Sequence, residues 1–252
     1  MSNFTTQQII NSASKGTTKT HKPYTRVVQE GFTPLSAPDA ANCIYFKKNV
    51  LAEEKVKEFI QNCSEYQMKQ YPAFYGNMMA YEEICFTPNG DAFRYAGKSR
   101  MSQKYPPFVL DFIEDIEKST DLSINECYQL ANSILIHYSP SIKHSGKLGY
   151  HSDKGHSAGD LIFIYSLGQT RNFLIRSKTS TCRPLYVQLP HNSVLAMIGS
   201  TFQDDFEHSL EELDSVKDEA HHRLSFNVRF KSNDGKRKLA GEETVQKRIK
   251  IY

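Results

Sequence analysis

The sequence predicts an α+β protein whose core is a jelly roll of two packed β-sheets, preceded by helices and by an aromatic-rich segment. Residues 127–230 break into about eight short apolar runs between turn residues, with little helical pattern among them, which is typical of double-sheet β folds. Two amphipathic helical patterns come first, over 52–68 and 107–118. Between them, residues 73–105 carry many aromatic side chains punctuated by Gly and Pro, which predicts turns in this segment.

The two ends of the chain differ in composition from the middle. Residues 1–40 are rich in Ser, Thr, Gln and Lys without a sustained period, which predicts a flexible N-terminal segment, mostly disordered or loosely draped. We assign 41–230 to a single domain and 231–252 to a basic flexible tail. Seven basic against three acidic residues give this tail a net charge of +4, so the rest of the chain sums to −1 of the total +3. Attraction to nucleic acid would therefore come from the tail or from local patches.

The first elements follow from local patterns. A short strand is expected over Asn42 to Phe46. The helix over 52–68 has an apolar stripe at i, i+3, i+4 and i+7 and an acidic first turn, which predicts a packing helix outside the main sheet. Asn89-Gly90 predicts a β-hairpin within residues 73–105, and Pro107 opens the second helix.

Composition excludes some classes of protein. The chain has no run of eighteen apolar residues, so no membrane span is expected. The first thirty residues lack an apolar core, so we expect no secretory signal. The five cysteines form no Cys-x-x-Cys pair, which argues against a zinc site and for reduced thiols. These features predict an intracellular monomer, in the nucleus or cytoplasm, and the basic tail could serve nuclear import or nucleic-acid binding.

The candidate chemistry centres on residues 148–153, Leu-Gly-Tyr-His-Ser-Asp. His151 and Asp153 are two apart, which on a strand puts both side chains on one face. His208 follows in Phe-Glu-His-Ser-Leu. Two His and one carboxylate can occupy one face of an octahedral metal, as in non-haem Fe(II) oxygenases. Asp153 as a turn residue and His208 as a surface residue are the alternatives. Five other histidines could compete as ligands, namely His144, His156, His191, His221 and His222.

The last strand pattern, over 223–230, alternates strictly. Leu, Phe, Val and Phe alternate with Arg223, Ser225, Asn227 and Arg229, so one face is apolar and the other must point to a wet place. Two Arg on one face suit a dicarboxylate because guanidinium binds carboxylate bidentately. Salt bridges on an exposed face are the alternative.

Together these motifs resemble the AlkB family of Fe(II)/2-oxoglutarate dioxygenases, over about residues 75–230. The matching landmarks, in family order, are Ile-Leu-Ile-His-Tyr138, His151-Ser-Asp153, Ser166-Leu-Gly168 with Arg171-Asn-Phe173, Leu189-Pro-His-Asn-Ser193 with Val-Leu-Ala-Met197, His208-Ser-Leu, and Arg223-x-Ser-x-x-x-Arg229. The last is the most specific, since the family's closing motif is Arg-x-Asn/Ser-x-x-x-Arg.

The resemblance implies a double-stranded β-helix, a nucleotide-recognition lid over about 73–105 and a set of site residues. It implies Fe(II) held by His151, Asp153 and His208, with 2-oxoglutarate and O2 as co-substrates. The residues implied for 2-oxoglutarate are Tyr138, Arg223, Ser225, Asn227 and Arg229. The residues implied for the substrate are Phe93, Tyr95, His156 and Arg176. An aromatic side chain offers a flipped base a stacking surface, although the lid aromatics could instead pack a core of their own.

Two positions depart from the family pattern. The family usually has Asn two before the Tyr, where this chain has Ile136, and the loss of one hydrogen bond to 2-oxoglutarate is worth about 1 kcal/mol. Many nucleic-acid demethylases of the family carry an acid two after the ligand Asp, where this chain has Gly155 followed by His156. His156 could stand in at the base edge. For Arg176, a surface salt bridge is the alternative.

The function implied is oxidative demethylation of N-alkylated bases in DNA or RNA, for repair or for erasure of modifications, with release of formaldehyde, succinate and CO2. One alternative is a 2-oxoglutarate oxygenase that hydroxylates a protein or small molecule. Another is a non-catalytic jelly roll that binds nucleic acid.

Overall fold

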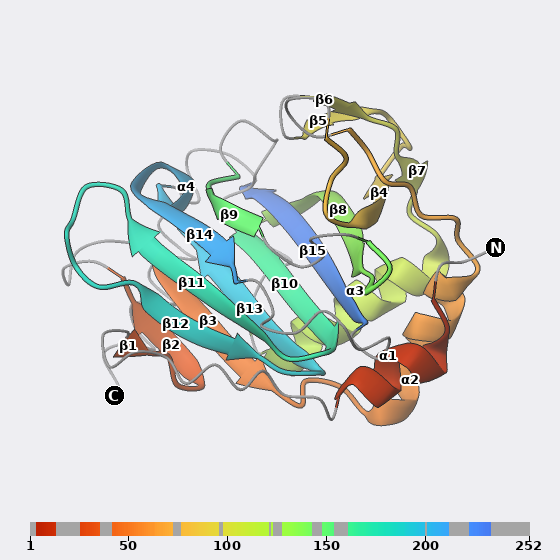
Figure 1. Cartoon of the computed structure of the whole chain (residues 1–252), viewed down its shortest axis with the longest axis horizontal. Coiled ribbons are helices and arrows are strands. Elements are labelled where there is room, and N and C mark those ends of the chain that lie inside the picture. The colour runs from red at the N-terminus through yellow and green to blue at the C-terminus, as the bar shows by residue number, and fades with distance from the viewer. Residues whose placement is uncertain are drawn as a thin grey trace.

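In the computed structural model, two β-sheets pack face to face and helices cover the outer face of the larger sheet (Figure 1). The structure describes residues 4–13, 26–35, 42–72, 77–95, 98–120, 122, 128–142, 148–153, 161–199, 201–211 and 222–232. This arrangement confirms the predicted jelly-roll core and α+β class.

The larger sheet has eight strands, and in spatial order these are β2 (Gly31–Pro34), β3 (Cys43–Lys48), β13 (Ser193–Ile198), β10 (Leu161–Gly168), β15 (Arg223–Ser232), β8 (Tyr128–Tyr138), β4 (Glu82–Thr87) and β7 (Gln103–Lys104). Neighbours are antiparallel except for β4 and β7. The strand predicted over 42–46 is β3. The larger sheet therefore includes strands that precede residue 127, where the predicted jelly-roll core began.

The smaller sheet has five strands, in the order β1 (Arg26–Val27), β12 (Leu185–Leu189), β11 (Arg171–Ser177), β14 (Phe206–Leu210) and β9 (Leu148–His151). The turn from β10 to β11 requires glycine, because Gly168 has φ +83° and a Cβ there would lie 2.5 Å from the His222 carbonyl oxygen. Two short strands, β5 (Phe93–Tyr95) and β6 (Lys98–Arg100), form a separate hairpin.

Two apolar cores flank the larger sheet. Between the sheets, side chains from β3, β8, β10, β13, β11 and β12 interdigitate. On the outer face, α2 (Glu53–Ser64) and α3 (Pro107–Thr120) pack on the sheet. The rings of Phe59 and Phe112 stack at 3.6 Å, and both contact Phe226 of β15. The apolar residues of β15 thus face the helices, and its polar residues face the space between the sheets.

The N-terminal segment contains more regular structure than the sequence indicated. Residues 6–13 form α1 (Thr6–Ala13), which packs on β10 and buries Ile9 completely. Parts of 26–34 form β1 and β2. The expectation of a loosely draped segment is therefore wrong for these residues, because a few apolar contacts with the sheet order what local periodicity does not.

The lid also differs from the expectation. Strand β4 belongs to the larger sheet, so the lid is narrower than 73–105. No hairpin forms at Asn89-Gly90; the Gly90 N–H closes a turn on the Thr87 carbonyl, and the chain continues to β5. The hairpin turn lies between Tyr95 and Lys98. At the other end, β15 extends to Ser232, and residues 233–252 of the predicted tail lie outside the described residues.

None of the described helices is long and apolar enough to span a membrane.

Candidate metal centre

Three side chains meet at one end of the space between the sheets. His151, Asp153 and His208 each offer one ligand atom, and these atoms lie within 4.8 Å of one another. Strands β14 and β9 pair with His208 opposite His151, and the two rings lie 4.3 Å apart, centre to centre. The pairing of two strands therefore joins residues 57 positions apart in the chain.

The backbone fixes which nitrogen of His151 faces Asp153. The Nδ1 of His151 lies 2.8 Å from the Gly149 carbonyl oxygen, to which it can donate a hydrogen bond. Its Nε2 lies 3.9 Å from Asp153 Oδ1. A histidine whose second nitrogen is held by a carbonyl is oriented as metal-binding histidines usually are.

Asp153 is held by groups on either side. Burial alone would raise the pKa of its carboxyl, but the charge of Arg229, joined at low pH by those of protonated His208 and His151, holds that pKa well below its usual range. Arg229 donates a 2.9 Å hydrogen bond to Oδ2, and the Asp153 N–H donates to Gln203 Oε1 at 2.8 Å. Asp153 is therefore an anion with one oxygen, Oδ1, available to a cation.

His208 is a neutral imidazole in this environment. It is 4% exposed and stacks on Phe173 at 5.2 Å. Burial, with the nearby charge of His151 adding to it, lowers the pKa of His208 to about 3. A neutral ring is the form that binds a metal.

The donor set fits Fe(II). Among the described residues, Oδ1 of Asp153 and Nδ1 of His208 are buried without a hydrogen-bond partner. Buried polar atoms are rarely left unsatisfied, and a cation bound by the three side chains would relieve this local deficit. Two imidazoles and one carboxylate form the ligand type that non-haem Fe(II) takes.

The pocket next to the three ligands suits an anionic co-substrate. Arg223 is 1% exposed, and its guanidinium is bonded to the neutral hydroxyls of Ser166 and Tyr138. Burial lowers the pKa of Arg223. Since a buried cation without a carboxylate partner is unfavourable, an incoming carboxylate would be stabilised here. The pocket is lined by Ile136, Tyr138, Leu148, His151, Asp153, Ile164, Phe173, His208, Leu210, Arg223, Ser225, Asn227 and Arg229.

A family model bears directly on this geometry. The model of the 2OG-Fe(II) oxygenase superfamily matches residues 43–229. The chain belongs to the 2OG-Fe(II) oxygenase superfamily. As an oxygenase of this superfamily, the protein uses Fe(II), 2-oxoglutarate and O2. No curated protein matches it by sequence.

Two solved structures share the oxygenase fold. OsALKBH1 is 19% identical, with a TM-score of 0.51, and the match covers 80% of this chain and 99% of that one. An oxidoreductase of the 2OG-Fe(II) oxygenase family from Burkholderia pseudomallei is 9% identical, with a TM-score of 0.55, and the match covers 82% of this chain and 95% of that one. The first is an AlkB homologue, in agreement with the resemblance found in the motifs.

The residues expected to bind 2-oxoglutarate all line the oxygenase's pocket. Ser225 and Asn227 are hydrogen-bonded to each other at 3.4 Å, and the Asn227 amide also donates to backbone carbonyl oxygens. Arg229 contacts Asp153, which the sequence did not indicate. Ile136 faces the pocket and is 4% exposed, so the position that the family usually fills with Asn is apolar here.

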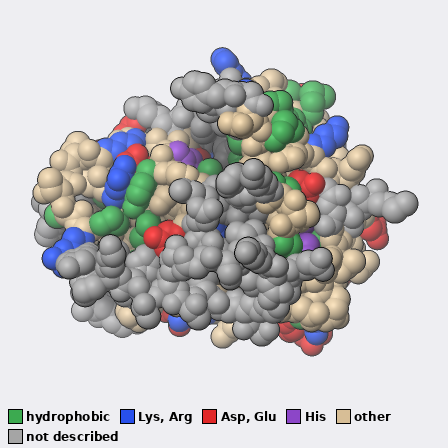
Figure 2. Space-filling model, in the orientation of Figure 1, with side chains coloured by type: hydrophobic (Ala, Val, Ile, Leu, Met, Phe, Trp, Pro, Cys, Tyr) green, Lys and Arg blue, Asp and Glu red, His purple; other side chains and the backbone are tan. Residues whose placement is uncertain are grey.

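The residues expected to bind substrate do not share one location, and the side chains of two of them lie outside the described part of the structure. Phe93 packs against the apolar cluster between the sheets, which shares several residues with the pocket wall. Tyr95 lies in β5, but its side chain is outside the described part of the structure, as is His156. Figure 2 shows a histidine side chain at the surface over β9, with Lys and Arg side chains nearby.

Arg176 does not reach the pocket of the oxygenase. Its register partner Glu207 is adjacent to His208, so both side chains point to the outer face of the smaller sheet. There Arg176 pairs with Glu207 at 2.5 Å and lies over the ring of Tyr150 at 3.7 Å. The surface salt bridge, considered as the alternative, is what forms. The substrate role of Arg176 was implied by the family resemblance alone, and the structure does not bring this residue to the pocket.

Several contributing residues were not predicted. Gln203 lies on α4 (Phe202–Asp205), a single turn just before β14, and no sequence signal points to its contact with Asp153. The Gly149 carbonyl, which orients His151, is a backbone group, so no side-chain pattern in the sequence points to it. Arg171 lies 5.8 Å from the Tyr138 ring, and its place in the Arg171-Asn-Phe173 landmark could have drawn attention to it.

Among the described residues, the other histidines do not join the centre. His191 accepts a hydrogen bond from the Gly168 N–H and lies 3.5 Å from Glu53. His222 is bonded to His137 at 3.0 Å. The remaining candidates, His144, His156 and His221, lie outside the described residues.

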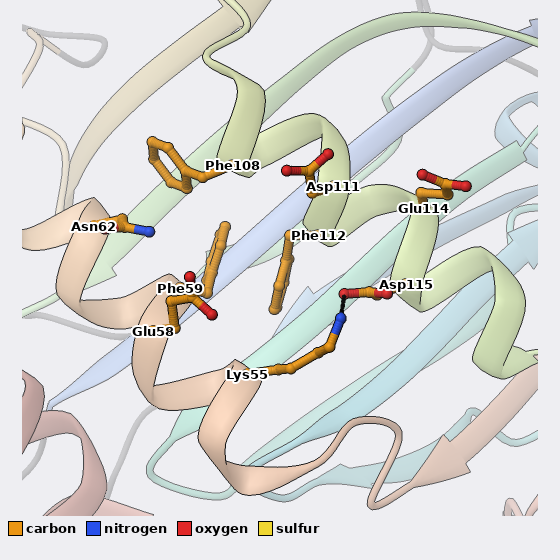
Figure 3. A pocket seen from close by; sticks show the side chains of 9 residues that line it. All are labelled: Lys55, Glu58, Phe59, Asn62, Phe108, Asp111, Phe112, Glu114 and Asp115. Carbon is orange, nitrogen blue, oxygen red and sulfur yellow. Dashed lines mark hydrogen bonds and ion pairs between the residues drawn. The ribbon is translucent and has the colours of Figure 1, made fainter.

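A second cavity, of about 370 Å³, lies between α2 and α3 of the oxygenase (Figure 3). Phenylalanine and acidic side chains line it, and the Lys55 ammonium forms an ion pair there with the Asp115 carboxylate at 2.5 Å. It contains no histidine and lies on the helix side of the larger sheet, away from the candidate metal centre.

Proposed function

We propose that this oxygenase removes alkyl groups oxidatively from the nitrogen atoms of DNA or RNA bases. The observation that carries the proposal is the β5–β6 hairpin, whose Phe93 packs against the pocket-side cluster. A flipped base needs a flat apolar surface next to the reacting centre. The AlkB-like order of motifs and the fold similarity to OsALKBH1 support the same substrate class.

In this proposal His151, Asp153 and His208 hold the iron. The unpartnered Asp153 Oδ1 and the buried neutral ring of His208 support these roles. Arg229 would orient Asp153 by binding its other oxygen. The Gly149 carbonyl would keep the Nε2 of His151 turned toward the metal.

Arg223 would bind a carboxylate of 2-oxoglutarate through its planar fork, with Tyr138 adding a hydroxyl contact. Ser225, Asn227 and Arg229 complete the polar face of β15 beside them. Apolar side chains opposite, including Ile164, Leu210 and Phe173, would keep water away from the reaction.

When bound, Fe(II) with 2-oxoglutarate and O2 supplies the oxidation that converts an N-methyl group to N-hydroxymethyl, with succinate and CO2 as co-products. The hydroxymethyl group then leaves as formaldehyde, and its hydroxyl proton is transferred to the base nitrogen. The protein's own side chains bind, orient and shield.

The test is incubation of the oxygenase with DNA and RNA oligonucleotides that carry N-methylated bases. We expect succinate above the background and a mass loss of one methylene, both abolished by His208→Ala. Arg176→Lys, on the outer face of the small sheet, is the matched control and should stay active. If the wild type produces neither signal on any oligonucleotide, the proposed substrate class is wrong.

A second candidate keeps the oxygenase chemistry and changes the substrate to a protein or small molecule. The near-neutral charge of residues 1–230 favours it, because nucleic-acid binding normally relies on basic surface. Substrate-stimulated 2-oxoglutarate turnover, screened across oligonucleotides, peptides and metabolites, chooses between the two. A non-catalytic binding module would instead bind nucleic acid equally well after His208→Ala.

A further inference from the structure

A fully buried ion pair connects the β5–β6 hairpin to β4, which pairs with β8, one of the strands that line the candidate metal pocket. The Arg100 Nε lies 2.5 Å from Glu83 Oε1, and both side chains are 1% exposed. Arg100 ends β6, directly opposite Phe93 of β5. Because removing both charges from water is costly, an ion pair buried this completely adds little to the net free energy of folding. Its role is better explained as holding the hairpin in place.

The surroundings of Arg100 hold it in one orientation. Its guanidinium lies over the ring of Tyr71 at 4.3 Å. The backbone of Glu83 exchanges hydrogen bonds with that of Lys69, at 2.9 and 3.1 Å. From the same strand as Arg100, the Lys98 ammonium donates to the Pro72 carbonyl at 2.9 Å. Residues 69–72 and β4 together therefore fasten one strand of the hairpin.

Glu83 is also connected to the pocket. It is the register partner of Ile136, which is in turn the partner of Ser225, and both of these line the pocket. Burial raises the pKa of Glu83, while the charges of Arg100 and Arg229 oppose that rise. Arg229 is the residue bonded to Asp153, so the hairpin's attachment and the candidate iron ligand share one electrostatic environment.

We propose that Arg100 and Glu83 form a positioning pair that fixes the β5–β6 hairpin, and with it Phe93, against the apolar cluster that shares residues with the pocket wall. The pair acts on the substrate through Phe93 and does not touch the reacting atoms. Arginine is required because its planar guanidinium can bind a carboxylate and stack on Tyr71 at once, which lysine cannot do. The identity of the substrate rests on the proposed function; the attachment of the hairpin does not.

The test uses two variants of the full chain. Arg100→Lys keeps the charge but loses the fork and the stacking. The double variant Glu83→Leu with Arg100→Met removes both charges, so no buried charge is left unpaired. The control is Lys55→Met with Asp115→Leu, which removes an ion pair on the helix side of the larger sheet.

The first readout is amide hydrogen exchange, which needs no substrate. In both variants we expect the amides of residues 93–95 and 98–100 to exchange about tenfold faster or more, while β10 and β15 keep their protection. The second readout is the visible band of the anaerobic Fe(II)–2-oxoglutarate complex, which should be unchanged. The control should behave as the wild type in both measurements.

The third readout uses a methylated oligonucleotide. We expect KM to rise about tenfold, and formaldehyde formed per succinate to fall, because a displaced hairpin leaves the oxidation uncoupled from the substrate. Unchanged hairpin exchange in either folded variant, or loss of the Fe(II)–2-oxoglutarate band, overturns the proposal. If the wild type accepts no oligonucleotide, the demethylase function fails, and the exchange result still decides whether the pair anchors the hairpin.

Discussion

The guanidinium of Arg229 binds one oxygen of Asp153 at 2.9 Å, and the other oxygen, Oδ1, faces His151 Nε2 at 3.9 Å. The two carboxylate oxygens thus have different surroundings. One is satisfied by a buried cation, and the other has no hydrogen-bond partner among the described residues. The family resemblance implied that Arg229 binds 2-oxoglutarate; that role stays a prediction, and the contact with Asp153 adds a second one.

Arg229→Met should weaken iron binding. Without the guanidinium, the Asp153 carboxylate loses the bond that orients it, and partners of metal ligands typically contribute 10- to 100-fold to metal affinity. Anaerobic titration with Fe(II) measures this loss. Arg176→Met is the control and should leave the affinity unchanged, whereas equal losses in both variants would show that the contact with Asp153 is not the cause.

Arg223→Lys should weaken 2-oxoglutarate binding without removing iron. The variant keeps the charge but loses the bidentate fork, and a charged hydrogen bond is worth about 1.5–3 kcal/mol, or roughly 10- to 100-fold in Kd. Calorimetric titration of 2-oxoglutarate into the Fe(II)-loaded protein measures the change. An unaltered affinity would contradict the role proposed for Arg223.

Ile136→Asn tests the position at which this chain departs from the AlkB pattern. The side chain faces the pocket and is buried, so an amide there could donate to 2-oxoglutarate. We expect binding to tighten about fivefold, the equivalent of one hydrogen bond of about 1 kcal/mol, and the ligand-free protein to lose stability. Ile136→Val, which adds no polar group, should not tighten binding.

Glu117 should make stability depend on pH. Burial, with the charge of Glu114 adding to it, raises the pKa of Glu117 from its usual value of 4.5 to about 7. Because the folded-state pKa lies above the unfolded one, ionised Glu117 opposes folding: its penalty is absent below about pH 4, develops as the pH rises and is complete above about pH 7.

Glu117→Gln should therefore raise the free energy of unfolding at pH 8 by about 1 kcal/mol, a figure reduced for the partial exposure of the side chain. Most of that gain should vanish by pH 4.5. Urea denaturation at both pH values measures it, with the exposed Glu54→Gln as the control. A gain that is the same at both pH values would rule out ionisation as its cause.

Phe112→Ala should destabilise the fold while sparing the metal centre. Its ring stacks on Phe59 and lies 5.1 Å from Tyr165, ring centre to ring centre, and Phe-to-Ala changes in cores typically cost about 3–5 kcal/mol. Leu110→Ala on the same helix is the control, since Leu110 is 44% exposed and should cost less than about 0.5 kcal/mol. Similar losses in both variants would contradict the packing described here.

The faces of a strand were predicted best where apolar and polar residues alternate strictly. In β15, apolar and polar residues alternate from Arg223 to Lys231, so the division of its two faces between helices and pocket could be read directly. In β11, three consecutive apolar residues conceal the period, so no local pattern assigns a face to Arg176, whose expected substrate role came from the resemblance alone. Local pattern determines a face only when one side of the strand is polar.

The remaining errors arose where tertiary contacts outweigh local signals. The turn-forming pair Asn89-Gly90 predicted a hairpin, yet β4 pairs with β8 and the hairpin is formed later in the chain, by β5 and β6. Helix α1 is short, and burial of Ile9 against the sheet stabilises it. The contact of Gln203 with Asp153 spans 50 residues, and no local pattern encodes it.

The most direct test of the metal centre is anaerobic titration with Fe(II) and 2-oxoglutarate, monitored by the weak visible charge-transfer band of the chelate, in the wild type and in Asp153→Ala. The geometry predicts a band in the wild type that is lost in the variant. No band in the wild type, or a band that persists in Asp153→Ala, would contradict the assignment of His151, Asp153 and His208 as the iron ligands.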